Sequence, residues 1–206
     1  MSKSNLEIES KFFVQSLVPV EARLITLGAI CIAPRGFEYN LRFDNRQASL
    51  QRQHKVLRLR KFDDNRLTFK GPGERIANAY SRKEVEFVVD DFDQAQQFLE
   101  CLGYHVAAVY EKYRAMYELG TAVITLDELP YGKFVEIEAE NPEQIDIIAV
   151  KLGLNPDCAI PASYQGLFEQ VKKSMNLSVK NLAFWEFENI HLSASDLGVK
   201  PADMSD

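Results

Sequence analysis

Cysteine, histidine and tryptophan are scarce in this chain of 206 residues, which holds three cysteines, three histidines and one tryptophan. Cys31, Cys101 and Cys158 are odd in number, lie far apart and form no C-x-x-C pair. This pattern excludes a disulfide framework and disfavours a zinc site. We therefore expect reduced, buried or half-buried thiols in a cytoplasmic protein.

Long apolar runs and an excess of positive charge are also missing. No run approaches the ~18 residues that a membrane span needs, and the N-terminal MSKSNLEIESKFF has no apolar core like that of a signal peptide. Thirty acidic against 24 basic residues give a formal net charge of −6. These features disfavour membrane partners and nucleic acid wrapped on the outer surface. A polyanionic ligand would need an enclosed cluster of Lys and Arg.

The composition, 46% hydrophobic and 26% charged, is that of a globular domain with a sizeable core. We place this domain at residues 1–175. Residues 176–206 form a C-terminal extension of different character, with Trp185 in a short apolar patch. The extension either packs on the domain or serves self-association or partner docking, so a homodimer stays open.

Apolar and polar residues alternate along much of the chain, which predicts strands. The expected strands are 5–14, 37–43, 55–62, 66–70, 80–89, 108–119, 121–128 and 133–140. Helical spacing of apolar residues, bounded by Pro or Gly, predicts helices at 19–28, 92–102, 142–153 and 163–175. We expect the Lys70–Gly73 turn to end a strand. Runs of strands followed by a helix indicate an α+β fold.

Like charges recur at every second position of these strands, and therefore on one strand face. The doublets are Glu7 and Glu9, Arg58 and Arg60, Glu84 and Glu86, Lys112 and Arg114, and Glu136 and Glu138. In any single strand, an ordinary solvated face explains such a doublet. Repeated over many strands, the pattern favours ligands, because like charges repel unless an ion of opposite sign lies between them. Paired carboxylates suit a metal ion and paired arginines suit phosphate.

Equal numbers of acids and bases occupy these positions. The seven acids are Glu7, Glu9, Glu84, Glu86, Asp127, Glu136 and Glu138. The seven bases are Lys11, Arg58, Arg60, Lys70, Arg82, Lys112 and Arg114. A balanced set tolerates burial, and a triphosphate with two divalent cations would leave it close to neutral. A closed barrel with charges inside and helices covering its apolar outer faces would arrange this.

Seven ordered motifs resemble the CYTH superfamily, also called triphosphate tunnel metalloenzymes. They are E-x-E-x-K at 7–11, V-L-R-L-R at 56–60, F-K-G-P-G at 69–73, R-K-E-V-E at 82–86, E-K-Y-R at 111–114, I-T-L-D at 124–127 and G-K-F-V-E-I-E at 132–138. Ser163-Tyr164 resembles a pair in the bacterial branch of that family. The resemblance covers about residues 5–173.

The resemblance implies an eight-stranded antiparallel tunnel with helices outside and two Mg²⁺ or Mn²⁺ ions per site. It implies that Glu7, Glu9, Glu136 and Glu138 bind metal, with help from Glu84 or Glu86. It implies that all seven bases bind phosphate. We assign catalytic roles to Lys11, Asp127 and Glu136.

The family contains triphosphatases and class IV adenylate cyclases, and the same tunnel serves both. Water as the attacking group makes a triphosphatase, whereas a ribose 3′-hydroxyl makes a cyclase that releases pyrophosphate. LGYH at 102–105 and the K-G-P-G turn look most like the cyclase branch. We favour hydrolysis of an inorganic or organic triphosphate. A cyclase and a non-catalytic polyphosphate- or nucleotide-binding module are the alternatives, and the 5′-triphosphate end of an RNA is the one nucleic-acid substrate left open.

Overall fold

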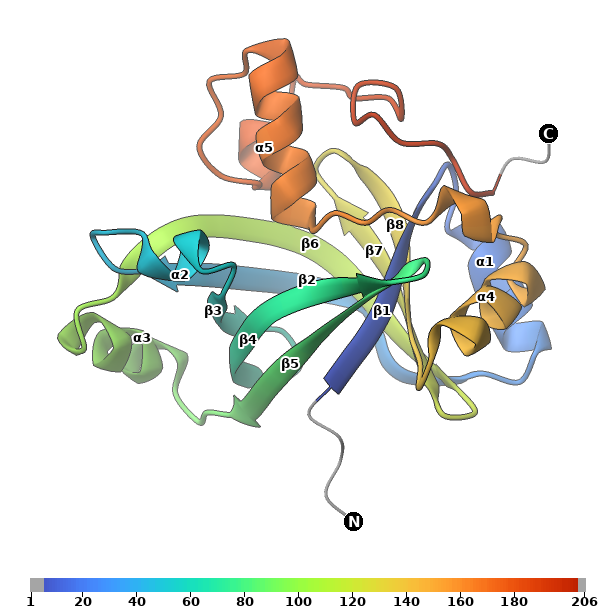
Figure 1. Ribbon diagram of the computed structural model, residues 1–206, viewed down its shortest axis with the longest axis horizontal. Coiled ribbons are helices and arrows are strands. Elements are labelled where there is room, and N and C mark those ends of the chain that lie inside the picture. The colour runs from blue at the N-terminus through green and yellow to red at the C-terminus, as the bar shows by residue number, and fades with distance from the viewer. Residues whose placement is uncertain (1–5, 204–206) are drawn as a thin grey trace.

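The computed structural model describes residues 6–203, and the side chains of Leu6 and Glu7 lie outside that description. Eight antiparallel strands close into a barrel in the order β1-β5-β4-β3-β2-β6-β7-β8 (Figure 1). The strands are β1 Leu6–Val14, β2 Ile30–Asp44, β3 Val56–Lys61, β4 Asn65–Ile76, β5 Ala79–Val88, β6 His105–Leu119, β7 Ala122–Leu129 and β8 Gly132–Glu138. The predicted eight-stranded α+β barrel is therefore confirmed.

Helices surround this barrel, with α1 and α4 on one side of it and α2 and α3 on the other (Figure 1). They are α1 Val18–Thr26, α2 Ser49–Arg52, α3 Phe92–Cys101, α4 Pro142–Lys151 and α5 Tyr164–Met175, with short 3-10 turns at Pro156–Cys158 and Phe184–Glu186. Side chains of Asp91, Asn141 and Ser163 cap α3, α4 and α5 by accepting a backbone N–H of the first turn. Across the described residues, none of these helices has the length and apolar character to cross a bilayer.

Two strands run longer than predicted because β-bulges accommodate Pro and Gly. β4 continues to Ile76, with a register shift against β5 between Lys70 and Gly73. The expectation that Lys70–Gly73 ends a strand was therefore wrong. β2 likewise begins at Ile30, with two register shifts against β6 before Gly36. A bulge leaves a residue unpaired, so a proline without an N–H interrupts the ladder without ending the strand.

The inward-facing residues of β1 and β8 change from charged to aromatic toward one end of the barrel. Lys11 and Glu136 face inward, and Phe13 and Phe134 follow them on the same strand face. The two rings pack edge to face at 5.4 Å, and Phe134 packs at 5.1 Å on Tyr164 of α5. This end of the interior is therefore filled by an apolar plug that packs against α5.

The C-terminal segment after α5 packs on its own barrel. Leu182, Phe187 and Leu197 are buried in the same apolar cluster as the plug. The N–H of Leu182 donates to the carbonyl of Val109 on β6 at 3.1 Å, and that of Ala202 donates to the carbonyl of Phe13 at 2.8 Å. The first of our two interpretations of the segment therefore fits the structure.

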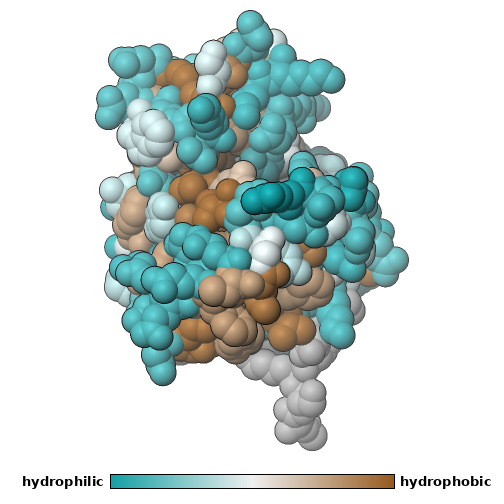
Figure 2. All heavy atoms as spheres, turned by 90° about the vertical axis from the view of Figure 1, so that its left-hand side faces the viewer, coloured by the Kyte–Doolittle hydropathy of each residue, from teal (hydrophilic) through white to brown (hydrophobic). Residues whose placement is uncertain are grey.

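Apolar residues remain at the surface in several places, among them the outer face of β5 and the helix α3, so the helices cover the outer faces only in part. On the outside of β5, Val85 and Phe87 are 40% and 53% exposed. Phe98 of α3 and Leu102, which follows α3 in the chain, are also exposed. Figure 2, which faces the side with α2 and α3, shows apolar surface there. The small core under α3 is built from Leu41, Phe43, Leu59 and Leu99.

The cysteines are free, as predicted, but their burial was partly mispredicted. Cys158 is half-buried, whereas Cys31 and Cys101 are exposed. Cys31 lies on the early part of β2 and Cys101 at the end of α3, where the neighbouring surface carries no covering element. A count of cysteines cannot show on which side of an element each thiol falls.

Candidate functional site

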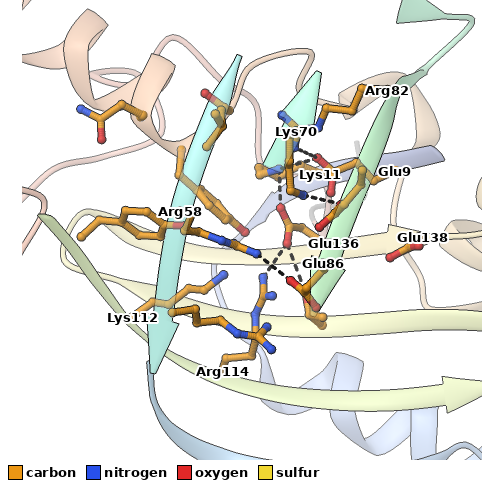
Figure 3. Close-up of a pocket in the computed structure, with 18 of the residues that line it drawn as sticks. Glu9, Lys11, Arg58, Lys70, Arg82, Glu86, Lys112, Arg114, Glu136 and Glu138 are labelled. Carbon is orange, nitrogen blue, oxygen red and sulfur yellow. Dashed lines mark hydrogen bonds and ion pairs between the residues drawn. The ribbon is translucent and has the colours of Figure 1, made fainter. Parts of the chain in front are cut away.

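The barrel encloses a cavity of about 530 Å³ whose walls are mostly charged. Figure 3 shows basic and acidic side chains from strands around the barrel directed into one space. The basic side chains that line it are Lys11, Arg42, Arg58, Arg60, Lys70, Arg82, Lys112 and Arg114. The acidic ones are Glu9, Glu84, Glu86, Glu136 and Glu138. Bases outnumber acids here by eight to five, so the described lining carries an excess of positive charge.

The structure thus brings together the seven bases predicted to bind phosphate and five of the six acids predicted to bind metal. The sixth acid, Glu7, has its side chain outside the described residues, although its backbone pairs with that of Arg82. Asp127 is the exception among the described candidates, because it does not line the cavity.

Asp127 lies fully buried behind the cavity wall and holds two of the lining bases. Arg114 donates to both of its carboxylate oxygens at 2.6 Å, and Lys112 Nζ lies at 3.1 Å. The hydroxyl of Tyr164 donates to the same carboxylate at 2.8 Å. Four donors on one buried carboxylate fix the directions of both cations.

A second fully buried acid, Glu38 of β2, supports the same cations. Its carboxylate lies 3.4 Å from Lys112 Nζ and 3.9 Å from both Arg60 and Arg114. Burial opposes ionisation of Glu38, but the positive charges of Lys112, Arg114, Arg58 and Arg60 outweigh it and lower its pKa to about 2. The lining bases are therefore backed by two buried, ionised carboxylates.

Sequence analysis missed both Glu38 and the cavity-lining Arg42. The strand at 37–43 was predicted, and Glu38, Asn40 and Arg42 occupy alternate positions on it. The same-face rule that we used on the other strands identifies all three. We missed them because this strand shows no doublet of like charge.

Glu136 joins Lys11 to Arg114 near the apolar plug. Lys11 Nζ lies 2.5 Å from one Glu136 oxygen and Arg114 lies 2.6 Å from the other. Burial favours the neutral acid, but Lys11, Arg114 and Lys112 hold the pKa of Glu136 well below its ordinary value. Burial also lowers the pKa of Lys11, but Glu136 and Glu9 raise it overall. Both members of the pair are therefore charged at neutral pH.

Ion pairs also line the opposite side of the cavity. Lys70 lies 2.9 Å from Glu84, and Arg58 lies 3.3 Å from Glu86. Glu86 also accepts from Thr68 at 2.7 Å and pairs with Arg66 at 3.0 Å. Burial opposes the ionisation of Glu86, whereas these contacts lower its pKa. Glu86 is thus engaged with neighbouring bases on its own side of the barrel.

The carboxylates of Glu9 and Glu138 form the donor set that best suits a divalent cation. The two residues pair directly across β1 and β8, and both line the cavity. Like charges in directly opposed positions repel, which a cation relieves. Mg²⁺ binds through one or two carboxylates, completing its octahedron with water and substrate phosphate. Among the described side chains, those of residues 8–203, no three acidic, His or Cys groups converge on one point, and the pair fits such a partly open metal site.

Comparison with known proteins identifies the family. The family model of the CYTH domain matches residues 5–151 of this chain. No curated protein sequence matches the chain significantly. The resemblance that the seven motifs indicated is therefore confirmed over most of its length.

Solved structures share the fold. A Vibrio parahaemolyticus protein provisionally described as an adenylate cyclase superposes with a TM-score of 0.71 at 23% identity, covering 80% of this chain and 98% of its own. The PH1012 protein of Pyrococcus horikoshii gives 0.62 at 28% identity, covering 77% and 96%. A Hippeastrum protein, described as a provisional adenylyl cyclase with a dominant triphosphatase activity, gives 0.59 at 18% identity, covering 79% and 95%.

Proposed function

The chain belongs to the CYTH domain family, and on that premise we propose that it hydrolyses an inorganic or organic triphosphate inside the barrel with the help of divalent metal ions. The excess of basic over acidic side chains around one enclosed cavity carries the proposal. A cavity of about 530 Å³ lies within the usual size range of small-ligand sites.

The bases on the Asp127 side form the preorganised part of the phosphate site. Lys112 and Arg114 are held in place before any ligand binds, because Asp127 and Glu38 fix them from behind. Donors fixed in advance stabilise developing charge without reorganising at the moment of reaction. We therefore assign Asp127, predicted as catalytic, a positioning role.

Lys11 and Glu136 line the cavity beside Arg114, one of the bases proposed to bind phosphate. Lys11 is protonated and supplies a hydrogen-bond donor to a phosphate oxygen. The lowered pKa of Glu136 keeps it ionised, so it orients Lys11 and Arg114 rather than taking up a proton. Attack of water on the terminal phosphorus breaks the bridging P–O bond and gives phosphate and diphosphate, with one proton passing to solvent.

Glu9 and Glu138 would hold the cation, Mg²⁺ or Mn²⁺, together with the other predicted acids Glu7 and Glu84. When bound, the cation neutralises phosphate oxygens and acidifies a water molecule. The family resemblance supports two ions per site. The cytoplasmic location stays a prediction, as does the homodimer that the C-terminal segment left open.

Adenylate cyclase activity is the alternative, because the same residues would bind the phosphates of ATP. The cavity offers few aliphatic side chains to a nucleobase. Its apolar lining consists of Val56, Met116 and Val123. Its two tyrosines already use their hydroxyls, Tyr110 as the acceptor from Arg58 and Tyr164 as the donor to Asp127. These observations favour hydrolysis.

The test supplies inorganic triphosphate and ATP with Mg²⁺ or Mn²⁺ and resolves phosphate, pyrophosphate and cyclic AMP. We expect phosphate release from at least one of them. Cyclic AMP with pyrophosphate would establish the cyclase, and binding without turnover would establish a binding module. Glu9→Gln and Glu138→Gln should lose most turnover, whereas Glu140→Gln, an exposed control outside the cavity, should not. Full activity in excess chelator would refute the metal requirement.

A further inference from the structure

Arg42 differs from every other base that lines the cavity. The other seven each lie within 4.0 Å of a carboxylate, as the pairs of Lys11, Arg58, Arg60, Lys70, Arg82, Lys112 and Arg114 show. Arg42 has no such partner among the described side chains, those of residues 8–203. Its nearest acidic neighbour on the chain, Asp44, instead caps the turn after β2 by accepting the N–H groups of Leu50 and Gln51.

The position of Arg42 makes the absence of a carboxylate partner energetically unfavourable. It pairs directly with Arg58 across β2 and β3, and both side chains face the cavity. Like charges in directly opposed positions destabilise a sheet. Burial, with the nearby charges of Arg82 and Arg58, lowers the pKa of Arg42. An anion bound between these side chains would remove the repulsion.

Arg42 also lies apart from the preorganised bases. It is four residues along β2 from Glu38, which contacts Lys112, so the two backbone positions are about 13 Å apart at ~3.3 Å per residue. A ligand that reaches both must carry negative charge along its length. A nucleoside would instead present an uncharged sugar and base to Arg42.

We infer that Arg42 is a specificity-determining residue that binds an additional phosphoryl group, so that the site prefers a linear inorganic polyphosphate of four phosphoryl groups over triphosphate and over nucleoside triphosphates. This inference rests on the proposed function for its turnover readout alone. The cation excess of the lining, eight bases against five acids, is the charge pattern that such a ligand requires.

The experiment compares the wild type, Arg42→Gln and the exposed control Arg46→Gln with inorganic tetraphosphate, inorganic triphosphate and ATP. For tetraphosphate we expect Arg42→Gln to lower kcat/KM by at least about tenfold through KM, as loss of a charge-assisted bond implies. For triphosphate and ATP the loss should be under about threefold. Arg46→Gln should match the wild type throughout. Equal losses for the three substrates, or none, would overturn the inference.

Calorimetric titration of tetraphosphate in the presence of chelator separates binding from turnover. Arg42→Gln should weaken this binding about tenfold and leave triphosphate binding within threefold. If the wild type hydrolyses nothing but shows this difference, the proposed function fails and the Arg42 site stands. Without ligand, Arg42→Gln should melt at or above the wild-type temperature, because the repulsion from Arg58 is relieved. A lower melting temperature with unchanged tetraphosphate binding would assign Arg42 a merely structural role.

Discussion

Two walls of the barrel differ in what covers their outer faces. The packed wall, formed by β6, β7, β8 and β1, lies under α1, α4, α5 and the C-terminal segment, and its outward residues Phe12, Ile124 and Ile137 are fully buried. The open wall, formed by β4 and β5, leaves Val85 and Phe87 on the outside of β5 40% and 53% exposed. The same barrel therefore has one wall in the protein interior and one close to solvent.

Of the two walls, the packed one holds the most deeply buried charges of the inner face. On the packed wall, Asp127, Lys112 and Arg114 share several contacts and are between 0% and 8% exposed. On the open wall, the acids Glu84 and Glu86 are 20% and 22% exposed, although Lys70 of β4 is as buried as Arg114. Where both faces are covered, each charge needs several partners to offset its lost hydration. The packed wall is therefore the rigid part of the site, and the open wall is the part that can adjust to a ligand.

The largest effect that this comparison predicts is on Asp127. Asp127→Asn leaves Lys112 and Arg114 buried beside a neutral side chain, and breaking a buried ion pair costs about 3–5 kcal/mol. Urea unfolding measures this loss. The exposed Asp90→Asn should change stability by less than about 0.5 kcal/mol. A loss below about 1 kcal/mol in Asp127→Asn would show that the packed wall is no more rigid than the open wall.

The pH dependence of stability tests the second buried acid, Glu38. Because its folded pKa of about 2 lies below the ordinary 4.5, its stabilising contribution is present above pH ~4.5. It is lost as the pH falls from there toward 2. The contribution is about 3 kcal/mol at 1.36 kcal/mol per pKa unit. The gap in unfolding free energy between wild type and Glu38→Gln should narrow by this amount from pH 6 to pH 2. A constant gap would contradict the assignment.

The C-terminal segment covers β6 of the packed wall, and its contacts predict a smaller effect. Leu182 is fully buried whereas Trp185 is 63% exposed. Leu182→Ala should cost about 2–3 kcal/mol, at the low end for a buried leucine because a surface segment can settle into the gap. Trp185→Ala should cost less than about 0.5 kcal/mol. Triphosphate hydrolysis should stay within a few-fold in both variants. Equal losses of stability would mean that the segment does not pack as described.

The smallest effect belongs to the outer face of the open wall. Phe87→Thr should change the unfolding free energy by less than about 0.5 kcal/mol, because Phe87 is 53% exposed and Thr keeps a strand-forming side chain. The matched Phe12→Thr, on the covered side, should cost at least about 3 kcal/mol. Phe87→Thr should also lower self-association, measured by light scattering, because it removes exposed apolar surface. A large loss of stability in Phe87→Thr would show that another part of the protein covers β5.

Much of the fold was predictable from the sequence because alternation and capping are local signals. All eight strands and the four longer helices were expected in their places, and Asn141 and Ser163 cap the helices that follow them. The short helix α2 was missed and β6 begins three residues earlier than expected, and the two largest errors fall at Pro and Gly. Lys70–Gly73 and the early part of β2 read as breaks in the sequence but are bulges within longer strands.

The inward face of each strand was likewise predictable, since alternate side chains share a face whatever the tertiary structure. This is why the seven predicted bases all line the cavity. The sequence did not show how deeply each of these side chains is buried. Asp127 shares the alternation of the lining residues, yet it lies behind Arg114 and has no exposure.

The sequence by itself determined where the eight strands lie and which residues share a face in each of them, because both follow from a two-residue period within each strand. Only the tertiary structure decided how those charges pair and which of them remain without a partner. Pairing depends on which strands become neighbours and in what register, as the opposition of Arg42 to Arg58 shows. Closing the barrel sets those contacts between residues far apart in the chain.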